Sequence, residues 1–225
     1  MPGSTLALVE WRLLQGVPGE DVRRVLAVAR RATYRKNEIV FHQGDPADSL
    51  HLISKGRFAI LVATPLGEHA TLAIRGSGES FGEMAIAGAG AKRSATVEAL
   101  EDAETFCVGQ SEFRRLRREH PGIDQLLIDF LAAEVRGLND RLLEALYVPV
   151  ERRVLRRLAE LTRIYGSEDG EVIIPLTQED LAGLVGATRP TINQVLRSLE
   201  SKGMVTLTRG KTIVVDREAL IAQAR

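Results

Sequence analysis

The strongest constraint on the fold is a change of sequence pattern near residue 110. Before that point short β-rich runs alternate with glycine-containing turns, whereas after it apolar residues recur at helical spacing. The runs expected to form strands are 38–41, 50–53, 58–63, 71–74 and 95–100. Many short strands with regular turns are typical of a β-sandwich or a barrel-like roll. We therefore expect an α+β protein whose strands come first.

The helical part is expected to begin with Ser111 as an N-cap and to break at 120–122. A long helix then covers 123–146 and ends before Pro149, because proline lacks a backbone donor and clashes with the preceding turn. Apolar residues in this helix repeat at spacings of four, three, four and three, namely at Leu131, Val135, Leu138, Leu142 and Ala145. The seam fits either an amphipathic helix lying on the β-domain or a parallel two-helix dimer interface.

The last third of the chain is expected to form a compact α/β unit. The elements expected there are helices over 150–165, 178–185 and 189–202, a strand over 172–174 and a final hairpin over 204–215. Three parts follow from these patterns: 1–122, 123–149 and 150–225. Residues 147–149 form a candidate hinge between the second part and the third.

Composition excludes several classes of protein. Hydrophobic residues make up 44% of the chain and charged residues 27%, which is typical of a globular protein. The single cysteine, Cys107, cannot form an internal disulfide and suits a reducing compartment; we expect it to be a small buried apolar residue. No apolar run approaches the length of a membrane span, and Glu10 and Arg12 interrupt any signal peptide. We therefore expect a cytoplasmic protein.

Metal chemistry is not expected. The four histidines, at positions 42, 51, 69 and 120, are scattered along the chain without metal-ligand spacing. We interpret them as surface residues or as residues with satisfied hydrogen bonds.

The most specific local pattern lies between residues 177 and 197. Thr177 and Asp180 can form a capping box, Gly186 suits a turn that needs a positive φ, and Pro190 falls where a missing N–H costs nothing. Apolar residues occupy the inward positions on both helices. This layout matches a helix-turn-helix, whose second helix enters the major groove of DNA. A plain helical hairpin with a solvated face is the alternative.

Polar residues gather on the other face of the second helix. Arginine can grip guanine with two hydrogen bonds, glutamine and asparagine can do the same to adenine, and threonine suits phosphate oxygens. A following hairpin turn could clamp the flanking DNA backbone as a wing. The residues expected at the DNA are Thr188, Arg189, Pro190, Thr191, Asn193, Gln194, Arg197, Arg209 and Lys211.

Charge is consistent with this assignment only when it is examined locally. Thirty basic and thirty acidic residues give a net charge of zero, which by itself argues against a nucleic-acid partner. Residues 1–146 carry −2 and residues 147–225 carry +2, however, and the segment 186–213 carries +4. The zero is therefore an average over a slightly acidic part and a basic DNA-contacting segment.

A second informative stretch contains Gly82, Glu83, Met84, Arg93, Ser94 and Ala95. Backbone N–H groups near Gly82 can attract an anion, Arg93 offers a delocalised cation for a phosphate diester, and Ser94 adds a hydroxyl donor. Glu83 is an acceptor suited to a ribose 2′-hydroxyl. Without context, Glu83 and Arg93 could equally be a surface ion pair beside a loop.

Together these motifs resemble the CRP/FNR family of bacterial transcription regulators, over about residues 17–215. The resemblance implies an N-terminal cyclic-nucleotide-binding β-roll, a long dimerisation helix and a C-terminal winged helix-turn-helix. It implies a homodimer that binds a pseudo-palindromic operator under control of cyclic AMP, or of cyclic GMP. Glu83 would take the ribose, and Arg93 and Ser94 the cyclic phosphate. The remaining expected ligand contacts are Ile60, Leu72, Leu138 and Asn139.

Two departures from the family pattern affect these expectations. The family's Thr-Ser pair against the adenine is Leu138-Asn139 here, so one adenine partner is lost and the seam gains an apolar residue. The base-reading Arg-Glu-x₃-Arg set is Arg189-Pro190 followed by Gln194. We therefore expect weak ligand dependence and an operator with adenine opposite Gln194.

Other functions are weighed against this one. A regulator of the same fold could act without ligand or sense another small molecule. A nucleotide hydrolase using Glu83 and His69 lacks a nucleophile–base set or a metal cluster, so no enzyme activity is expected. Iron–sulfur sensors need more cysteines, haem sensors need a histidine near the cassette, and a kinase regulatory subunit would lack the helix-turn-helix. By family analogy alone, the loop 166–171 could contact RNA polymerase.

Overall fold

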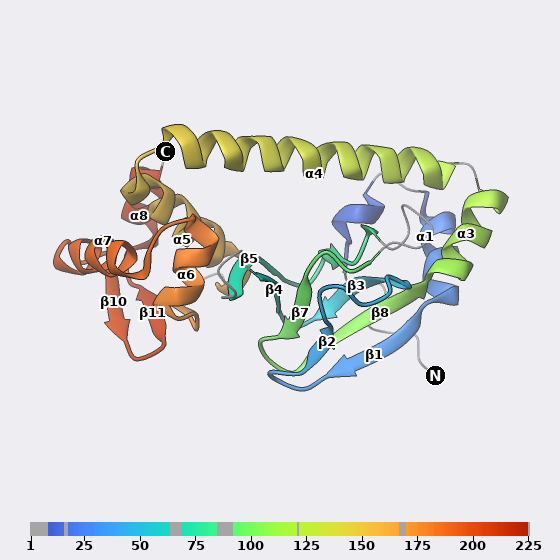
Figure 1. Ribbon diagram of the computed structural model, residues 1–225, viewed down its shortest axis with the longest axis horizontal. Helices are drawn as coiled ribbons and strands as arrows, with labels where there is room; N and C mark the ends of the chain where they lie inside the picture. Colours follow the sequence, from blue (N-terminus) through green and yellow to red (C-terminus); the bar gives the residue numbers. More distant parts are fainter. Residues whose placement is uncertain are drawn as a thin grey trace. The chain divides into compact units, whose positions relative to one another are not determined.

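The computed structural model describes residues 9–15, 18–63, 69–84, 92–120, 122–166 and 170–224 (Figure 1). The chain forms two compact units: Met1–His69 with Ala73–Val135, and Arg136–Arg225 with Ala70–Leu72, so the main division falls between Val135 and Arg136. The division falls inside the long helix α4 (Gly122–Tyr147). The three parts expected from the sequence place their boundaries at the two ends of this helix instead, and that division stays a prediction.

The first unit contains two four-stranded sheets. The order in one sheet is β1 (Arg30–Tyr34), β8 (Ala103–Gly109), β3 (Ser49–Lys55) and β6 (Ser80–Phe81). The order in the other is β2 (Ile39–Phe41), β7 (Thr96–Ala99), β4 (Phe58–Ala63) and β5 (His69–Arg75). The expected β-roll is confirmed, although β1, β6 and β8 were not among the expected strands.

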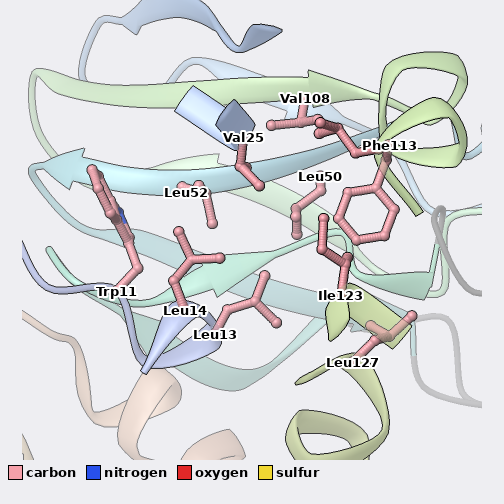
Figure 2. Close-up of a cluster of buried hydrophobic side chains, with 11 residues drawn as sticks. Trp11, Leu13, Leu14, Val25, Leu50, Leu52, Val108, Phe113, Ile123 and Leu127 are labelled. Carbon is pink, nitrogen blue, oxygen red and sulfur yellow. The ribbon is translucent and has the colours of Figure 1, made fainter. Parts of the chain in front are cut away.

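Buried aliphatic residues hold the first sheet against the helices (Figure 2). The 3₁₀ helix η1 (Arg12–Leu14) and helices α1 (Gly19–Val28), α3 (Gln110–Glu119) and α4 all contribute to this cluster. Trp11 joins it and donates from Nε1 to the carbonyl of Ile53 at 2.9 Å, which satisfies its one polar atom. A separate cluster around Ile53, Phe58 and Phe81 fills the space nearer β7.

Helix α3 begins earlier than expected. Its N-cap is Gly109, at the end of β8, and the amide of Gln110 donates to the carbonyl of Asp48 at 2.7 Å. The strand therefore runs directly into the helix. Ser111 lies inside the first turn and donates to Glu112, so the prediction of Ser111 as the N-cap is wrong.

The second unit is a winged helix-turn-helix. After α5 (Val150–Tyr165) come β9 (Val172–Ile174), α6 (Gln178–Val185) and α7 (Arg189–Ser201). The hairpin β10 (Val205–Thr208) and β11 (Lys211–Val214) pairs with β9, and α8 (Arg217–Ala224) packs on α5. The core consists of fully buried aliphatic residues, including Leu158, Ile174, Leu181, Ile192, Leu196, Leu199 and Leu220. Helix α8 was not expected from the sequence.

Local rules fix the turn between α6 and α7. Thr177 and Asp180 form the expected capping box, with the amide of Asp180 donating to Thr177 Oγ1 at 3.1 Å. Gly186 ends α6 at φ +67°, a left-handed conformation that glycine adopts without penalty. Pro190 lies in the first turn of α7. The predicted helix-turn-helix is confirmed.

None of the helices in the described parts of the chain combines the length and the apolar character that crossing a bilayer requires.

Candidate functional site

The first candidate site is built around Gly82, which follows β6 at φ +81°. A Cβ at this position would lie 2.7 Å from Nη1 of Arg93 and 2.8 Å from the carbonyl oxygen of Ser49. Only glycine allows the backbone this close to the guanidinium without displacing it. Two residues expected at the ligand, Gly82 and Arg93, are therefore in direct contact.

Arg93 is buried and almost fully hydrogen-bonded by the roll itself. Its Nη1 donates to the Ser49 carbonyl at 2.7 Å, and its Nη2 donates to Ser49 Oγ at 2.8 Å and to Asp48 Oδ1 at 2.9 Å. The guanidinium carbon lies 3.9 Å from the centre of the Phe41 ring, a cation–π contact. The Arg93 Nε is buried and has no hydrogen-bond partner among the residues that the structure describes. One donor of this guanidinium is therefore not used by the described part of the roll.

A buried histidine contacts the same serine hydroxyl that accepts from Arg93. His51, on β3, stacks on Phe81 with ring centroids 4.8 Å apart. Its Nε2 lies 3.3 Å from Ser49 Oγ, and its Nδ1 lies 3.1 Å from Thr105 Oγ1. Burial and the neighbouring Arg93 lower the pKa of His51 to about 3, so the ring is neutral at pH 7. This contact could not be predicted from the sequence, in which His51 is an isolated histidine.

Glu83 stands in a turn beside Gly82 and is half-buried. Burial raises its pKa, while the nearby cations Arg75 and Arg93 oppose that shift and Glu134 adds to it. Glu83, the expected ribose acceptor, therefore interacts electrostatically with charged residues that could not all be identified from the sequence. Arg75 and Glu134 are the members that sequence reasoning missed, because they lie on β5 and α4.

The other expected ligand residues differ in exposure. Ala95 is buried and Ile60 on β4 is half-buried, whereas Met84 and Leu72 are about half exposed and Ser94 is exposed. The residues between Met84 and Lys92, which join the two parts of this motif, lie outside the described residues. Leu138 and Asn139 are exposed on α4, in the second unit. They stay predicted members of the site.

The second candidate site is the outer surface of α7. Arg189, Pro190, Gln194 and Arg197 are exposed, whereas Thr191 and Asn193 are half-buried. Thr188 occupies the N-cap position as expected, but it makes no side-chain bond to the helix backbone. Its hydroxyl instead lies 2.9 Å from that of Thr191, leaving both at the surface for an anionic partner.

A groove of about 680 Å³ runs between α7, the start of α6 and the wing. Arg189 and Asn193 line it from α7, and Arg209 and Lys211 line it from the hairpin, whose turn contains Gly210 at φ +74°. Asn193 Nδ2 donates to Gln178 Oε1 at 2.8 Å, so Asn193 is tied to α6. Thr177 and Gln178 also line the groove, and sequence reasoning considered Thr177 only as a cap.

Apolar residues stand exposed along the second half of α4. Val135, Leu138 and Leu142 are each between 56% and 58% exposed, and Leu146 reaches 64%. Ala145 is exposed as well, whereas Leu131 is half-buried and packs against the core of the first unit. The predicted seam therefore lacks a free Leu131 at its start. Large apolar side chains at this spacing on one helix are typical of a surface that a partner covers.

Metal-ligating side chains do not gather anywhere in the described ranges in a group of three or more. Cys107 is buried, as expected, with its sulfur 3.8 Å from His51 Nε2.

Two family models match this chain. The cyclic nucleotide-binding domain matches residues 31–120, and the Crp-like helix-turn-helix domain matches residues 152–223. The first match covers the roll and the Gly82–Arg93 contact, and the second covers α6, α7 and the wing.

Curated relatives span nearly the whole chain. The cyclic AMP receptor protein of Thermus thermophilus is 30% identical over 211 residues, which cover 94% of this chain and 95% of the relative. The CRP-like cAMP-activated global transcriptional regulator of Mycobacterium tuberculosis is 28% identical over 216 residues, covering 95% and 96%. Among solved structures, the Thermus thermophilus catabolite activator protein is 29% identical, with a TM-score of 0.55, covering 94% of this chain and 97% of that one.

The chain therefore belongs to the CRP/FNR family of bacterial transcription regulators. It is a DNA-binding transcription regulator that combines a cyclic nucleotide-binding domain with a helix-turn-helix domain.

Proposed function

We propose that this regulator binds a cyclic nucleotide, with cyclic AMP as the first candidate, at the Gly82–Arg93 contact and thereby controls operator binding. The observation that carries the proposal is the cradle itself: glycine at a positive φ brings its backbone against a buried guanidinium whose Nε has no partner among the described residues. An anion is the natural occupant of such a place. Two of the curated relatives are named as cAMP-activated regulators, which also supports the proposal.

Within this proposal each side chain has one role. Arg93 and Ser94 bind the cyclic phosphate, Glu83 accepts from the ribose 2′-hydroxyl, and Met84 and Ala95 supply apolar contacts together with Ile60 and Leu72. Asn139 offers hydrogen bonds to the purine edge, whereas Leu138 offers none.

A homodimer is the proposed working form. The exposed apolar residues of α4 would be buried between two parallel copies of the helix, in the manner of an a/d seam. A two-fold dimer presents two copies of α7 about one duplex turn apart, so the proposed operator is a pseudo-palindrome. Contact with RNA polymerase is proposed for residues 166–171, of which 167–169 lie outside the described residues.

The chemistry of α7 suggests how the operator is recognised. The exposed Arg189 would bind guanine, and the exposed Gln194 would bind adenine. Arg197, Arg209 and Lys211 would contact phosphates, which fix register without reading sequence.

Two titrations test the proposal. Isothermal calorimetry with cyclic AMP and cyclic GMP measures nucleotide affinity, and fluorescence anisotropy with a labelled pseudo-palindromic duplex measures DNA affinity at one fixed salt concentration. We expect Arg93→Leu to abolish nucleotide binding, while Arg31→Leu, in an exposed ion pair of the same unit, leaves it unchanged. The absence of binding by the parent protein to either nucleotide would overturn the proposed ligand class.

Leu138 favours a second candidate, a regulator that binds DNA without a ligand. Its side chain is 57% exposed in the middle of the seam, where it would stabilise the paired helices in either ligand state. Operator binding at nanomolar affinity without nucleotide, unchanged by cyclic AMP, would support this candidate. A strict requirement for cyclic AMP would exclude it.

A further inference from the structure

We propose that Arg75 is a positioning residue that fixes Glu83 for the ribose 2′-hydroxyl and connects it to the long helix α4 through Glu134. The inference rests on the proposed nucleotide function and deepens it, because it adds a specificity determinant to the same site.

Arg75 forms two ion pairs, one with Glu79 and one with Glu134. Its side chain, at the end of β5, is 19% exposed and donates from Nη1 to Glu79 Oε1 at 2.9 Å and from Nη2 to Glu134 Oε2 at 3.1 Å. Glu79 in turn accepts from the amide of Gly76 at 2.8 Å, which closes the turn before β6. The guanidinium is therefore held by two partly buried carboxylates rather than by solvent.

Glu83 lies only four residues beyond Glu79, one of the two carboxylates that Arg75 binds. Glu79 precedes the two-residue strand β6, and Glu83 follows it, so the turn anchored by Arg75 leads directly into the nucleotide cassette. Arg75 and Glu83 interact electrostatically. Burial raises the pKa of Glu83, and the charge of Arg75 counteracts this rise more strongly than that of Arg93 does. Without Arg75, Glu79 and Glu134 would lose the cation that both carboxylates bind, and Arg93 would remain as the cation near Glu83.

The cluster of charged residues around Arg75 has no room for a ligand of its own. The cavity beside Arg75, lined by Arg12, Glu79, Phe130 and Glu134 among others, measures only about 10 Å³. That volume holds about one water molecule at most. The cluster is therefore a structural link between the cassette and the helix rather than a second pocket.

The link has a functional consequence. An oriented Glu83 carboxyl distinguishes a ribonucleotide from its 2′-deoxy analogue, because only the former has a 2′-hydroxyl to donate. Glu134 belongs to the same helix that carries the proposed dimer seam. Arg75 therefore joins the turn that leads into Glu83 to α4, because one guanidinium binds both Glu79 and Glu134.

The test compares cyclic AMP with 2′-deoxy cyclic AMP by calorimetry. We expect the parent protein to prefer cyclic AMP by roughly 10- to 100-fold, as for a hydrogen bond to a charged group. Arg75→Met should reduce this preference to less than about three-fold, while affinity for the deoxy analogue changes little. Arg75→Lys, which keeps the cation, should retain most of the preference. Arg31→Met removes an exposed ion pair of the same unit and should behave as the parent.

A second measurement tests the connection to the helix. Glu134→Gln should keep the sugar preference but reduce the effect of cyclic AMP on operator affinity by several-fold. Emission from Trp11, buried in the first unit, establishes that each variant is folded. If a folded Arg75→Met retains the full preference, the inference is overturned and the proposed function stands. If the parent binds neither nucleotide, both are overturned.

Discussion

The buried imidazole of His51 makes the stability of the first unit depend on pH. This side chain is 4% exposed, stacks on Phe81 and has both ring nitrogens near hydroxyl groups. Burial, followed by the charge of Arg93, lowers its pKa from 6.5 to about 3. Protonation in the folded chain would place a second cation in a site already occupied by a guanidinium.

The sign and size of the effect follow from linkage. Because the pKa is lowered in the folded chain, the unfolded chain binds the proton first as the pH falls. The stabilisation is therefore fully present above pH 6.5 and is lost as the pH falls from 6.5 towards 3. Between pH 7 and pH 5 the free energy of unfolding should decrease by about 2 kcal/mol from His51 alone.

Urea unfolding followed by Trp11 fluorescence measures this quantity. Trp11 is the only tryptophan of the chain, and it is buried against Phe106 in the first unit. We expect His51→Gln to lose about 2 kcal/mol less than the parent between pH 7 and pH 5, whatever its stability at pH 7. The exposed His42→Gln should follow the parent. Parallel losses in the parent and His51→Gln would refute the reasoning.

Three further changes give distinct outcomes. Gly82→Ala should weaken cyclic AMP binding at least tenfold in calorimetry, because its Cβ meets Arg93; Gly44→Ala, at φ +91° with open space around it, should strain the backbone without this loss. Thr177→Ala should lower the free energy of unfolding of the second unit by about 1 kcal/mol, measured by thermal melting, because the capping box is lost. Replacing the adenine opposite Gln194 should cost about 1–3 kcal/mol of operator affinity in the parent and much less in Gln194→Ala, measured by anisotropy.

The second unit could be predicted almost completely from the sequence, because local rules determine its turn. A capping box, a glycine at positive φ and a proline in a first turn each act over four residues or fewer, so they are visible in one short segment. Helix α8 was not predicted, because the residues that follow the wing carry no distinctive helical pattern.

The roll was less accessible to sequence reasoning, because its pairings are distant along the chain. Strand β1 carries mostly exposed or half-buried side chains and pairs with β8 in a register that joins Arg30 to Cys107. An edge strand of this kind lacks the alternation that identifies a half-buried strand. The same distance hid the Arg75–Glu134 pair, whose members lie 59 residues apart.

Two arginines interact electrostatically with Glu83, the buried Arg93 and the partly buried Arg75, and they differ in what holds them. This difference bears on which one a nucleotide can engage. Arg93 is 4% exposed, but its acidic partner Asp48 is 80% exposed, so water solvates that carboxylate whenever the pair opens. The carboxylates that hold Arg75 are only 26% and 27% exposed and cannot leave at comparable cost. Under the proposed function, a phosphate would replace Asp48 at Arg93, whereas Arg75 would keep its partners. The site thus combines one cation open to exchange with one that stays in place, which fits a phosphate contact at the former and a positioning role at the latter.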